Sequence, residues 1–197
     1  MAIKKQDFVK NAVNQSNNMN NLYKRFKTEI APKLKAELGL KNIMQVPAIK
    51  KVVLNVGVGK FTKEANYIEN VENTLRNITG QKPVRAKTNK AISNFKTRAG
   101  MVVGVSVILR GKRMYDFVEK LLTTTFPRVR DFRGIDPNSF DRAGNYNLGF
   151  KETLAFPEVK FDELDKAHGL EITICTTAAN KEVGLKLLTH LGFPFKK

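Results

Sequence analysis

Histidine and cysteine, the side chains that most often hold zinc, are few in this chain and lack the spacing of a metal site. The two histidines, His168 and His190, and the single cysteine, Cys175, form neither a C-x-x-C nor an H-x-x-x-H spacing. A lone cysteine cannot form an internal disulfide, and we expect Cys175 to pack as a small apolar side chain. The sequence therefore predicts no metal site.

Carboxylates that could act as general acid and base gather only near "FPEVKFDELD". They are interleaved with apolar residues, which is more typical of a solvated helix or turn. The members of a catalytic triad meet only in the fold, but no local signature supports one here. We therefore predict no enzyme activity and no cofactor. The carboxylates concerned are Glu158, Asp162, Glu163 and Asp165.

The segment "LNVGVGK", residues 54–60, could hold a nucleotide phosphate, because glycines and a lysine follow an apolar run. A Walker loop needs a glycine where Leu54 stands and Ser or Thr where Phe61 stands. The dinucleotide pattern G-x-G-x-x-G fails as well, with Thr62 at its third glycine. The segment is better interpreted as a tight turn after a strand.

A one-sign basic region is the strongest feature of the sequence. The stretch "GQKPVRAKTNKAISNFKTRAG", residues 80–100, holds six Lys or Arg and no acid, and no acid occurs anywhere from Asn73 to Tyr115. A solvated surface normally mixes charges of both signs. We therefore predict that the region binds phosphates, with part of it paired as a strand and its middle projecting as a loop.

The residue types in this loop suit RNA. Lysine and arginine reach backbone oxygens, Asn and Ser can bond 2′-hydroxyls or base edges, and Phe95 could stack on an exposed base. Alternatively, Phe95 anchors the loop to the core. The predicted contacts of the loop are Lys82, Arg85, Lys87, Asn89, Lys90, Ser93, Asn94, Phe95, Lys96 and Arg98.

A second basic cluster, residues 126–149, alternates arginine with aspartate. Its arginines could contact RNA, or they could bond the neighbouring acids within a long ordered loop. The sequence does not decide between RNA contact and intramolecular ion pairs. The arginines are Arg128, Arg130 and Arg133, and the acids are Asp131, Asp136 and Asp141.

The charge of the whole chain agrees with a polyanionic partner. Its 35 Lys and Arg exceed its 18 Asp and Glu, which gives a net charge of +17 and a pI of about 10.0. An anionic membrane is the weaker alternative, because the longest apolar run, residues 101–109, is far shorter than the roughly 20 residues of a spanning helix. The N-terminus also lacks the apolar core of a secretory signal. We expect a cytoplasmic protein.

The elements that would position these residues alternate between helix and strand. Apolar positions at helical spacing predict helices over 20–38, 66–79, 112–126 and 181–191, the second ended by Gly80 and the last capped by Asn180. We expect Pro32 to kink or restart the first helix and Pro127 to follow the third. Strands are predicted over 48–59, 102–110, 146–156 and 169–177.

This order favours an α+β fold over βαβ units. We predict a single domain over residues 19–197, in which a mostly antiparallel sheet carries helices on one face and a long basic loop. Residues 1–18 are polar and rich in Asn and Gln, and we interpret them as a flexible arm.

Four long motifs identify a family. The segments "MQVPAIKKVVLNVGVG", "TGQKPVRAKTNKAISNFKTRAG", "PRVRDFRGIDPNSFDRAGNYNLG" and "LLTHLGFPFKK" resemble, in order and spacing, bacterial large-subunit ribosomal protein five. The resemblance covers about residues 20–197. It implies a non-catalytic protein of the cytoplasmic ribosome.

The resemblance also implies partners. Members of this family attach 5S rRNA to 23S rRNA in the central protuberance and reach the P-site tRNA through a basic loop. Neighbouring ribosomal proteins and the small-subunit head, across an intersubunit bridge, are implied as well. The loop that matches is the basic stretch described above.

For 5S rRNA the resemblance implies a polar network on the sheet, at Asn55, Gln81, Arg110 and Glu171. Two positions depart from the family: Ile108 replaces a frequent Thr, and Glu171 replaces a frequent Asp. Since an acid does not bond phosphate directly, we expect Glu171 to orient Arg110.

Two other classes of protein would have a similarly high positive net charge. A free-standing RNA chaperone or nucleoid protein would bind many nucleic acids with little selectivity. An RNA-processing enzyme would need acids or metal ligands near the basic surface, and residues 73–115 contain none.

Overall fold

The computed structural model describes residues 22–61, 64–159 and 168–196. The chain divides into two compact units, with the boundary between Val46 and Pro47. The predicted arm, residues 1–18, lies outside the described residues. So do Asp162, Glu163 and Asp165 of the acidic cluster. The single domain predicted from residue 19 onward stays a prediction.

The described part of the first unit is a helical stretch followed by a short turn. It contains α2 (Leu22–Arg25), the π-helical turn η1 (Phe26–Ile30), α3 (Ala31–Glu37) and the 3₁₀ turn η2 (Ile43–Gln45). Pro32 lies in the first turn of α3, directly after the π turn, as expected of a proline that restarts a helix. The predicted apolar positions Leu22, Phe26, Ile30 and Leu34 are all buried.

The second unit confirms the predicted α+β class. Its five strands pair in the order β2-β3-β1-β5-β4, and every pair is antiparallel. The strands are β1 (Ile49–Gly57), β2 (Val84–Lys87), β3 (Val102–Leu109), β4 (Tyr146–Phe150) and β5 (Leu170–Thr176). The main helices are α4 (Ala65–Thr79), α5 (Gly111–Lys120), α6 (Phe126–Arg128) and α7 (Lys181–Leu191).

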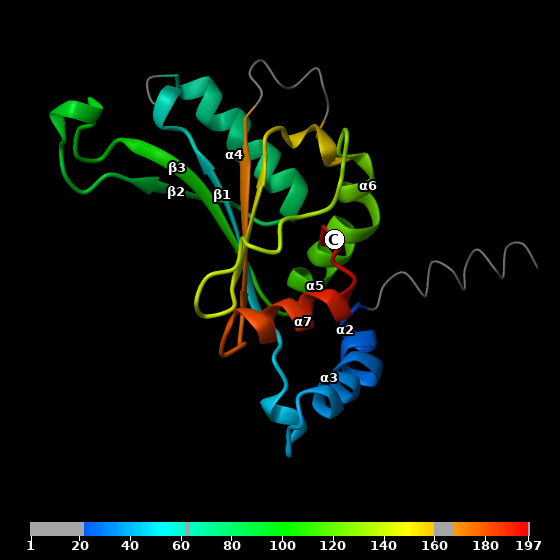
Figure 1. Ribbon diagram of the computed structural model, residues 1–197. Coiled ribbons are helices and arrows are strands. Elements are labelled where there is room, and N and C mark those ends of the chain that lie inside the picture. Colours follow the sequence, from blue (N-terminus) through cyan, green and yellow to red (C-terminus); the bar gives the residue numbers. More distant parts are fainter. Residues whose placement is uncertain (1–21, 62–63, 160–167, 197) are drawn as a thin grey trace, which may run out of the picture. The chain divides into compact units, whose positions relative to one another are not determined.

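Among the described residues of the second unit, helices cover one face of the sheet. Alternate residues of the central strands, such as Val52 and Leu54 of β1 and Ile172 of β5, are fully buried, while their neighbours on the other face are not. Helix α4 contacts β3 and helix α5 contacts β1 (Figure 1). The opposite side, here called the open face, is left for other contacts.

The π turn η5 (Leu121–Thr125) explains why one predicted boundary is wrong. Pro127 was expected just past the helix, but it lies inside α6, and helical structure continues to Arg128. In the π turn the N–H of Phe126 bonds the carbonyl of Leu121, so the turn widens directly before the proline. Pro127 then starts a new helical segment, a position that does not need its missing N–H.

Two other predictions need correction. The strand predicted over 146–156 ends at Phe150, because a 3₁₀ turn, η6 (Thr153–Ala155), replaces its second half. Asn180 stands at the N-terminus of α7, but its side chain makes no capping hydrogen bond. Its carbonyl instead accepts the N–H of Gly184, which begins the helical hydrogen-bond pattern.

Gly80 ends α4 in the left-handed conformation, as predicted, with φ +64°. Nothing lies within 4 Å of a Cβ added there, so substitution meets no steric obstacle and costs only backbone strain. We expect Gly80→Ala to lower the free energy of unfolding by about 1 kcal/mol. Urea denaturation checks this, with Gly57→Ala as the control, since Gly57 has equal space and no left-handed φ. Equal stability of the two variants would contradict it.

Candidate RNA-binding surface

The open face of the sheet carries polar side chains from neighbouring strands. The register places Asn55 of β1 between Glu171 of β5 and Ser106 of β3. These residues alternate with buried ones along their strands, so their side chains point away from the helices. Asn55 and Glu171, two of the four residues predicted to bind 5S rRNA, are therefore adjacent on this face.

A hydrogen bond joins these two residues. The Nδ2 of Asn55 donates to Oε2 of Glu171 over 3.3 Å. A carboxylate can only accept hydrogen bonds, so this contact fixes the amide of Asn55 with its oxygen turned away from Glu171. Asn55 thus offers a hydrogen-bond acceptor to a partner on the open face.

Gln81 and Arg110, the other two predicted residues, lie just past the ends of α4 and β3. Gln81 follows α4, and its Nε2 donates to the carbonyl of Ile108 over 3.3 Å. Arg110 follows β3 and precedes α5, with extended backbone and an exposed side chain. Ile108 points out from β3 with 44% of its surface exposed, so an apolar side chain stands on the open face.

The expected pairing of Glu171 with Arg110 is wrong. Glu171 pairs in register with Asn55, which is opposite Ser106, whereas Arg110 lies four residues beyond Ser106 along the chain. Within the described ranges, no ion pair joins the two side chains. Glu171 instead orients Asn55, and the guanidinium of Arg110 has no carboxylate partner there.

The basic loop is an ordered hairpin that continues β2 and β3 past the rest of the sheet (Figure 1). We define the basic hairpin as residues 82–101. The N–H of Thr88 donates to the carbonyl of Met101, and the N–H of Gly100 donates to the carbonyl of Thr88. The hydroxyl of Thr88 also donates to the carbonyl of Arg98. The predicted division into a paired strand and a projecting loop is confirmed.

The tip of the basic hairpin presents an aromatic ring to solvent. The short 3₁₀ turn η4 (Ser93–Phe95) ends at Lys96, which has a left-handed φ of 53°. The side chain of Phe95 is 75% exposed, so it does not anchor the loop to the core. Of the two readings of Phe95, a ring free to stack on a base is the one that fits this position.

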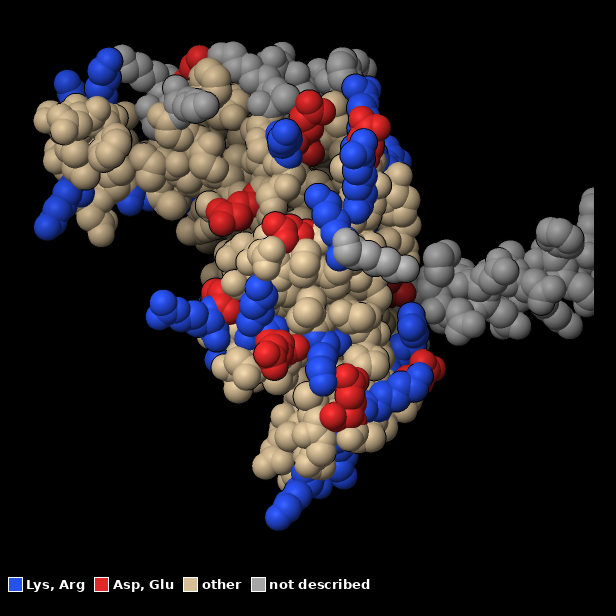
Figure 2. All heavy atoms as spheres, in the orientation of Figure 1, with Lys and Arg blue, Asp and Glu red and all other residues tan. Residues whose placement is uncertain are grey.

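The cations of the basic hairpin lie along its length, from Lys82 at its base to Lys96 at its tip. Figure 2 shows basic side chains projecting from the hairpin on more than one side. The predicted contacts Lys82, Lys87, Asn89, Lys90, Ser93, Asn94, Lys96 and Arg98 are all exposed. Within the described residues, none of the lysines in that set, nor Arg98, forms an ion pair.

Arg85 is the exception among the predicted contacts. It pairs in register with Val105, on the helix side of the sheet, and its guanidinium binds the carboxylate of Glu72 on α4. The hydrogen bond from Arg85 lowers the pKa of the Glu72 carboxyl, and the same contact raises the pKa of the Arg85 guanidinium. Arg85 therefore pins the edge strand β2 to α4 and is not a free phosphate contact.

The Arg85–Glu72 pair gives a testable difference in salt dependence. We expect Glu72→Ala to release Arg85, which can then bind one more phosphate of an unrelated single-stranded RNA. The slope of log association constant against log salt concentration should therefore become more negative by about 0.7. Arg85→Ala should leave that slope unchanged. Filter binding over a salt series measures it, and Glu182→Ala on α7 controls for the change in net charge. Equal slopes for Glu72→Ala and Glu182→Ala would contradict the assignment.

The second basic cluster does not contain the predicted pairs. Asp136 accepts the N–H of Asn138, and both oxygens of Asp141 accept hydrogen bonds from Asn145. Burial alone would raise the pKa of Asp141, but hydrogen bonds from Asn145 and from the N–H of Ala143 lower it.

The three arginines of this cluster therefore keep their charges for other partners. Arg128, Arg130 and Arg133 are exposed, and they form no ion pair with the described carboxylates. The intramolecular reading of the cluster is wrong, and contact with another molecule is left as the alternative.

The residues considered for catalysis do not assemble in the described part of the chain. No group of three or more His, Cys, Asp or Glu side chains there could hold a metal ion. Glu158 bonds Lys120 over 2.6 Å, and His168 is buried. Cys175 is half-buried, on the face shared by Glu171, and so is not the core residue expected. No described helix is long and apolar enough to cross a membrane.

Sequence reasoning missed two polar residues of the open face. Thr173 of β5 pairs in register with Asn147 of β4, and its hydroxyl donates to Oδ1 of Asn147 over 2.8 Å. The alternation in "YNLGF" puts Asn147 opposite to the buried Tyr146, which is a usable signal. It identifies a face of one strand, however, and only the strand order brings that face beside Glu171.

Comparisons with known proteins identify related sequences. A family model described as ribosomal protein L5 matches residues 42–98, and one described as the C-terminus of the same ribosomal family matches residues 102–195. Large ribosomal subunit protein uL5 of Desulfatibacillum aliphaticivorans is 50% identical over 179 residues, which cover 91% of this chain and 100% of the relative. The protein of that name from Natranaerobius thermophilus is 48% identical over 177 residues, which cover 90% of this chain and 99% of the relative.

A third relative matches a slightly shorter part of the chain. Large ribosomal subunit protein uL5 of Francisella tularensis subsp. novicida is 50% identical over 171 residues, which cover 87% of this chain and 96% of the relative. The matched regions contain the strands of the open face, the basic hairpin up to Arg98 and the second basic cluster.

Proposed function

This chain belongs to the ribosomal protein L5 family of the large ribosomal subunit, and we propose that it binds 5S rRNA on the open face of its sheet. It is a ribosomal protein and not an enzyme, and its place is the ribosome of the cytoplasm. In this proposal it also helps to attach 5S rRNA to 23S rRNA in the central protuberance.

The open face is the observation that carries the 5S rRNA proposal. It carries Asn55 and Glu171 on an antiparallel sheet, and Gln81 and Arg110 lie just past the ends of α4 and β3. Oriented amides and a carboxylate can bond base edges and 2′-hydroxyls, which phosphate-binding lysines cannot distinguish. Selectivity for one RNA would therefore arise on the sheet, where side-chain positions are fixed by strand register.

The basic hairpin supports a second contact, with the P-site tRNA. Its cations are exposed around Phe95, and its base is held by hydrogen bonds from Thr88. A projecting, charged and ordered loop suits a partner that binds and leaves during each cycle of translation. Its contacts would be mostly to phosphates, with one stacking residue.

The second basic cluster is assigned in this proposal to ribosomal neighbours. Arg128, Arg130 and Arg133 are exposed and lack carboxylate partners among the described residues. They would contact 23S rRNA, adjacent proteins of the central protuberance, or the small-subunit head across an intersubunit bridge. The open face and the hairpin remain free for 5S rRNA and tRNA.

Competition binding tests the proposal. The chain, bound to labelled 5S rRNA at physiological salt, is challenged with unlabelled 5S rRNA, with a random RNA duplex and with an unrelated folded RNA. We expect 5S rRNA to compete at a concentration at least about tenfold lower than the others. Equal competition by all three would instead indicate an unselective RNA chaperone.

A further inference from the structure

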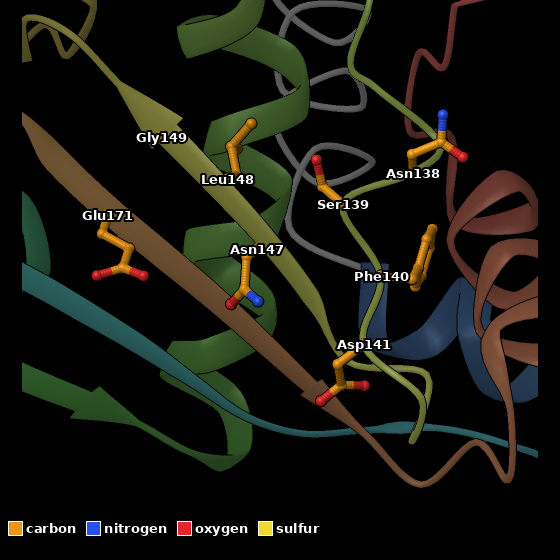
Figure 3. Close-up of a pocket in the computed structure, with 8 residues that line it drawn as sticks. All are labelled: Asn138, Ser139, Phe140, Asp141, Asn147, Leu148, Gly149 and Glu171. Carbon is orange, nitrogen blue, oxygen red and sulfur yellow. The ribbon is translucent and has the colours of Figure 1, made fainter.

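The open face continues onto β4 and ends in a hollow beside the loop segment 138–141 (Figure 3). The hollow measures about 610 Å³, within the size range of small-ligand sites. Its lining includes Asn147 and Gly149 from β4, Glu171 from β5, and Ser139 and Phe140 from the loop segment. It therefore combines polar groups with apolar surface at the end of the proposed 5S rRNA contact.

Strand register leaves space between two polar side chains in this hollow. Gly149 pairs with Glu171, and Asn147 pairs with Thr173 in the next outward-facing row. Nothing lies within 4 Å of a Cβ added at Gly149. Figure 3 shows the amide of Asn147 and the carboxylate of Glu171 extending from adjacent strands beside this glycine.

Neighbouring residues fix which atoms the two side chains offer. Because Thr173 donates to Oδ1 of Asn147, the Nδ2 of that amide is turned outward as a donor. Asn55 bonds only Oε2 of Glu171, and a carboxylate has about four acceptor positions. Within the described residues, no hydrogen bond occupies Nδ2 of Asn147 or Oε1 of Glu171. Asn147 thus offers a donor to the hollow, and Glu171 offers a group of acceptors.

We propose that this hollow binds an unpaired guanine of the RNA, with Asn147 and Glu171 reading its Watson–Crick edge. This inference rests on the proposed function. Guanine offers an acceptor at O6 and donors at N1 and N2, which complement the Asn147 donor and the Glu171 carboxylate. Gly149 leaves room for the ring against the backbone of β4.

The other three bases do not match. Adenine and cytosine would turn an amino donor toward the donor of Asn147, and uracil would turn its O2 acceptor toward the carboxylate. A carboxylate also repels phosphate, so Glu171 is suited to a base edge and not to the RNA backbone. In this proposal Asn147 determines specificity for the RNA, in addition to the four residues predicted to bind 5S rRNA.

Nucleotide-analogue interference tests the inference with the full chain and transcribed 5S rRNA. Inosine replaces guanosine sparsely in the RNA, removing only the N2 amino group, and RNA that still binds is separated and sequenced. We expect inosine to weaken binding at one unpaired guanosine. In Glu171→Ala, overall affinity should fall about tenfold and the interference at that nucleotide should disappear.

Matched variants separate the roles of the two side chains. Asn147→Ser should weaken binding but retain the interference, because Asn147 reads O6 and not N2. Asn147→Asp should weaken RNA binding more than Asn147→Ser does, because a second carboxylate would then face the O6 acceptor of guanine. Glu182→Ala removes the same charge from α7 and should change neither affinity nor interference. Thermal unfolding verifies that these exposed substitutions leave the fold intact.

Two outcomes would overturn the inference. One is that the parent chain selects 5S rRNA but no guanosine shows interference. The other is that the interference persists unchanged in Glu171→Ala. Failure of the proposed function would look different, because the parent chain would then show no preference for 5S rRNA over the unrelated RNA.

Discussion

Arg110→Ala is expected to weaken 5S rRNA binding by about 1–3 kcal/mol. Arg110 lies where β3 ends and α5 begins, with its side chain exposed and no carboxylate partner among the described residues. Its guanidinium therefore does not have to break an ion pair before it bonds the RNA. Because two N–H groups can bond one phosphate or one guanine edge, lysine should restore only part of the affinity.

The measurement is equilibrium binding of the full chain to 5S rRNA at fixed physiological salt. Arg76→Ala on α4 is the control, since it removes an exposed arginine from a helix that covers the opposite face of the sheet. We expect Arg76→Ala to stay within about twofold of the parent chain, because its loss removes only general charge. Equal affinities for Arg110→Ala and Arg76→Ala would remove Arg110 from the 5S rRNA contact.

Combined substitution of Lys87, Lys90 and Phe95 by alanine should impair tRNA engagement without harming 5S rRNA binding. Stacking on Phe95 should contribute about 1–3 kcal/mol, and the two lysines add salt-sensitive phosphate contacts. All three side chains are exposed on the basic hairpin, so the fold should tolerate the change. Lys96 is left intact because its left-handed backbone would make a substitution harder to interpret.

Two measurements on one preparation check this separation of contacts. P-site tRNA occupancy of ribosomes assembled with the triple variant should fall at least about tenfold at limiting tRNA. Affinity of the isolated variant for 5S rRNA should remain within about twofold of the parent. A large loss of 5S rRNA binding would show that the basic hairpin is part of that contact.

Patterns local to one element could be predicted from the sequence. The apolar stripe of α4, including Val71, Leu75 and Ile78, is buried, and Gly80 ends that helix in the expected conformation. The acid-free stretch forms the projecting hairpin as predicted. These features depend on side-chain periodicity and backbone preference within one segment, which are readable without knowledge of the fold.

Partnerships between segments could not be predicted in the same way. The basic stretch contains no acid, so the sequence predicts an unpaired Arg85, yet Glu72 on α4 binds its guanidinium. Glu171 was expected to meet Arg110, but strand register brings it to Asn55. Asn147 joins the open face only because β4 pairs with β5. Each of these contacts is determined by strand order and register.

Two local features also escaped prediction. The helix that contains Pro127 continues because a π turn precedes the proline, and no residue type in "LLTTT" signals that turn. The strand after Tyr146 ends early, where η6 replaces the extended backbone. In both cases one short turn replaces the backbone that the sequence pattern predicts. The helix and strand propensities of the residues do not predict such a turn.

The most direct test that 5S rRNA covers the open face uses Cys175, the single cysteine of the chain. It is half-buried, pairs in register with Lys51, and lies on the face of β5 that carries Glu171. The rate of its alkylation by a small maleimide can be followed by mass spectrometry. We predict that saturating 5S rRNA slows the reaction at least about tenfold and that an unrelated RNA does not. An unchanged rate with 5S rRNA fully bound would contradict the account, because the RNA would then occupy another surface.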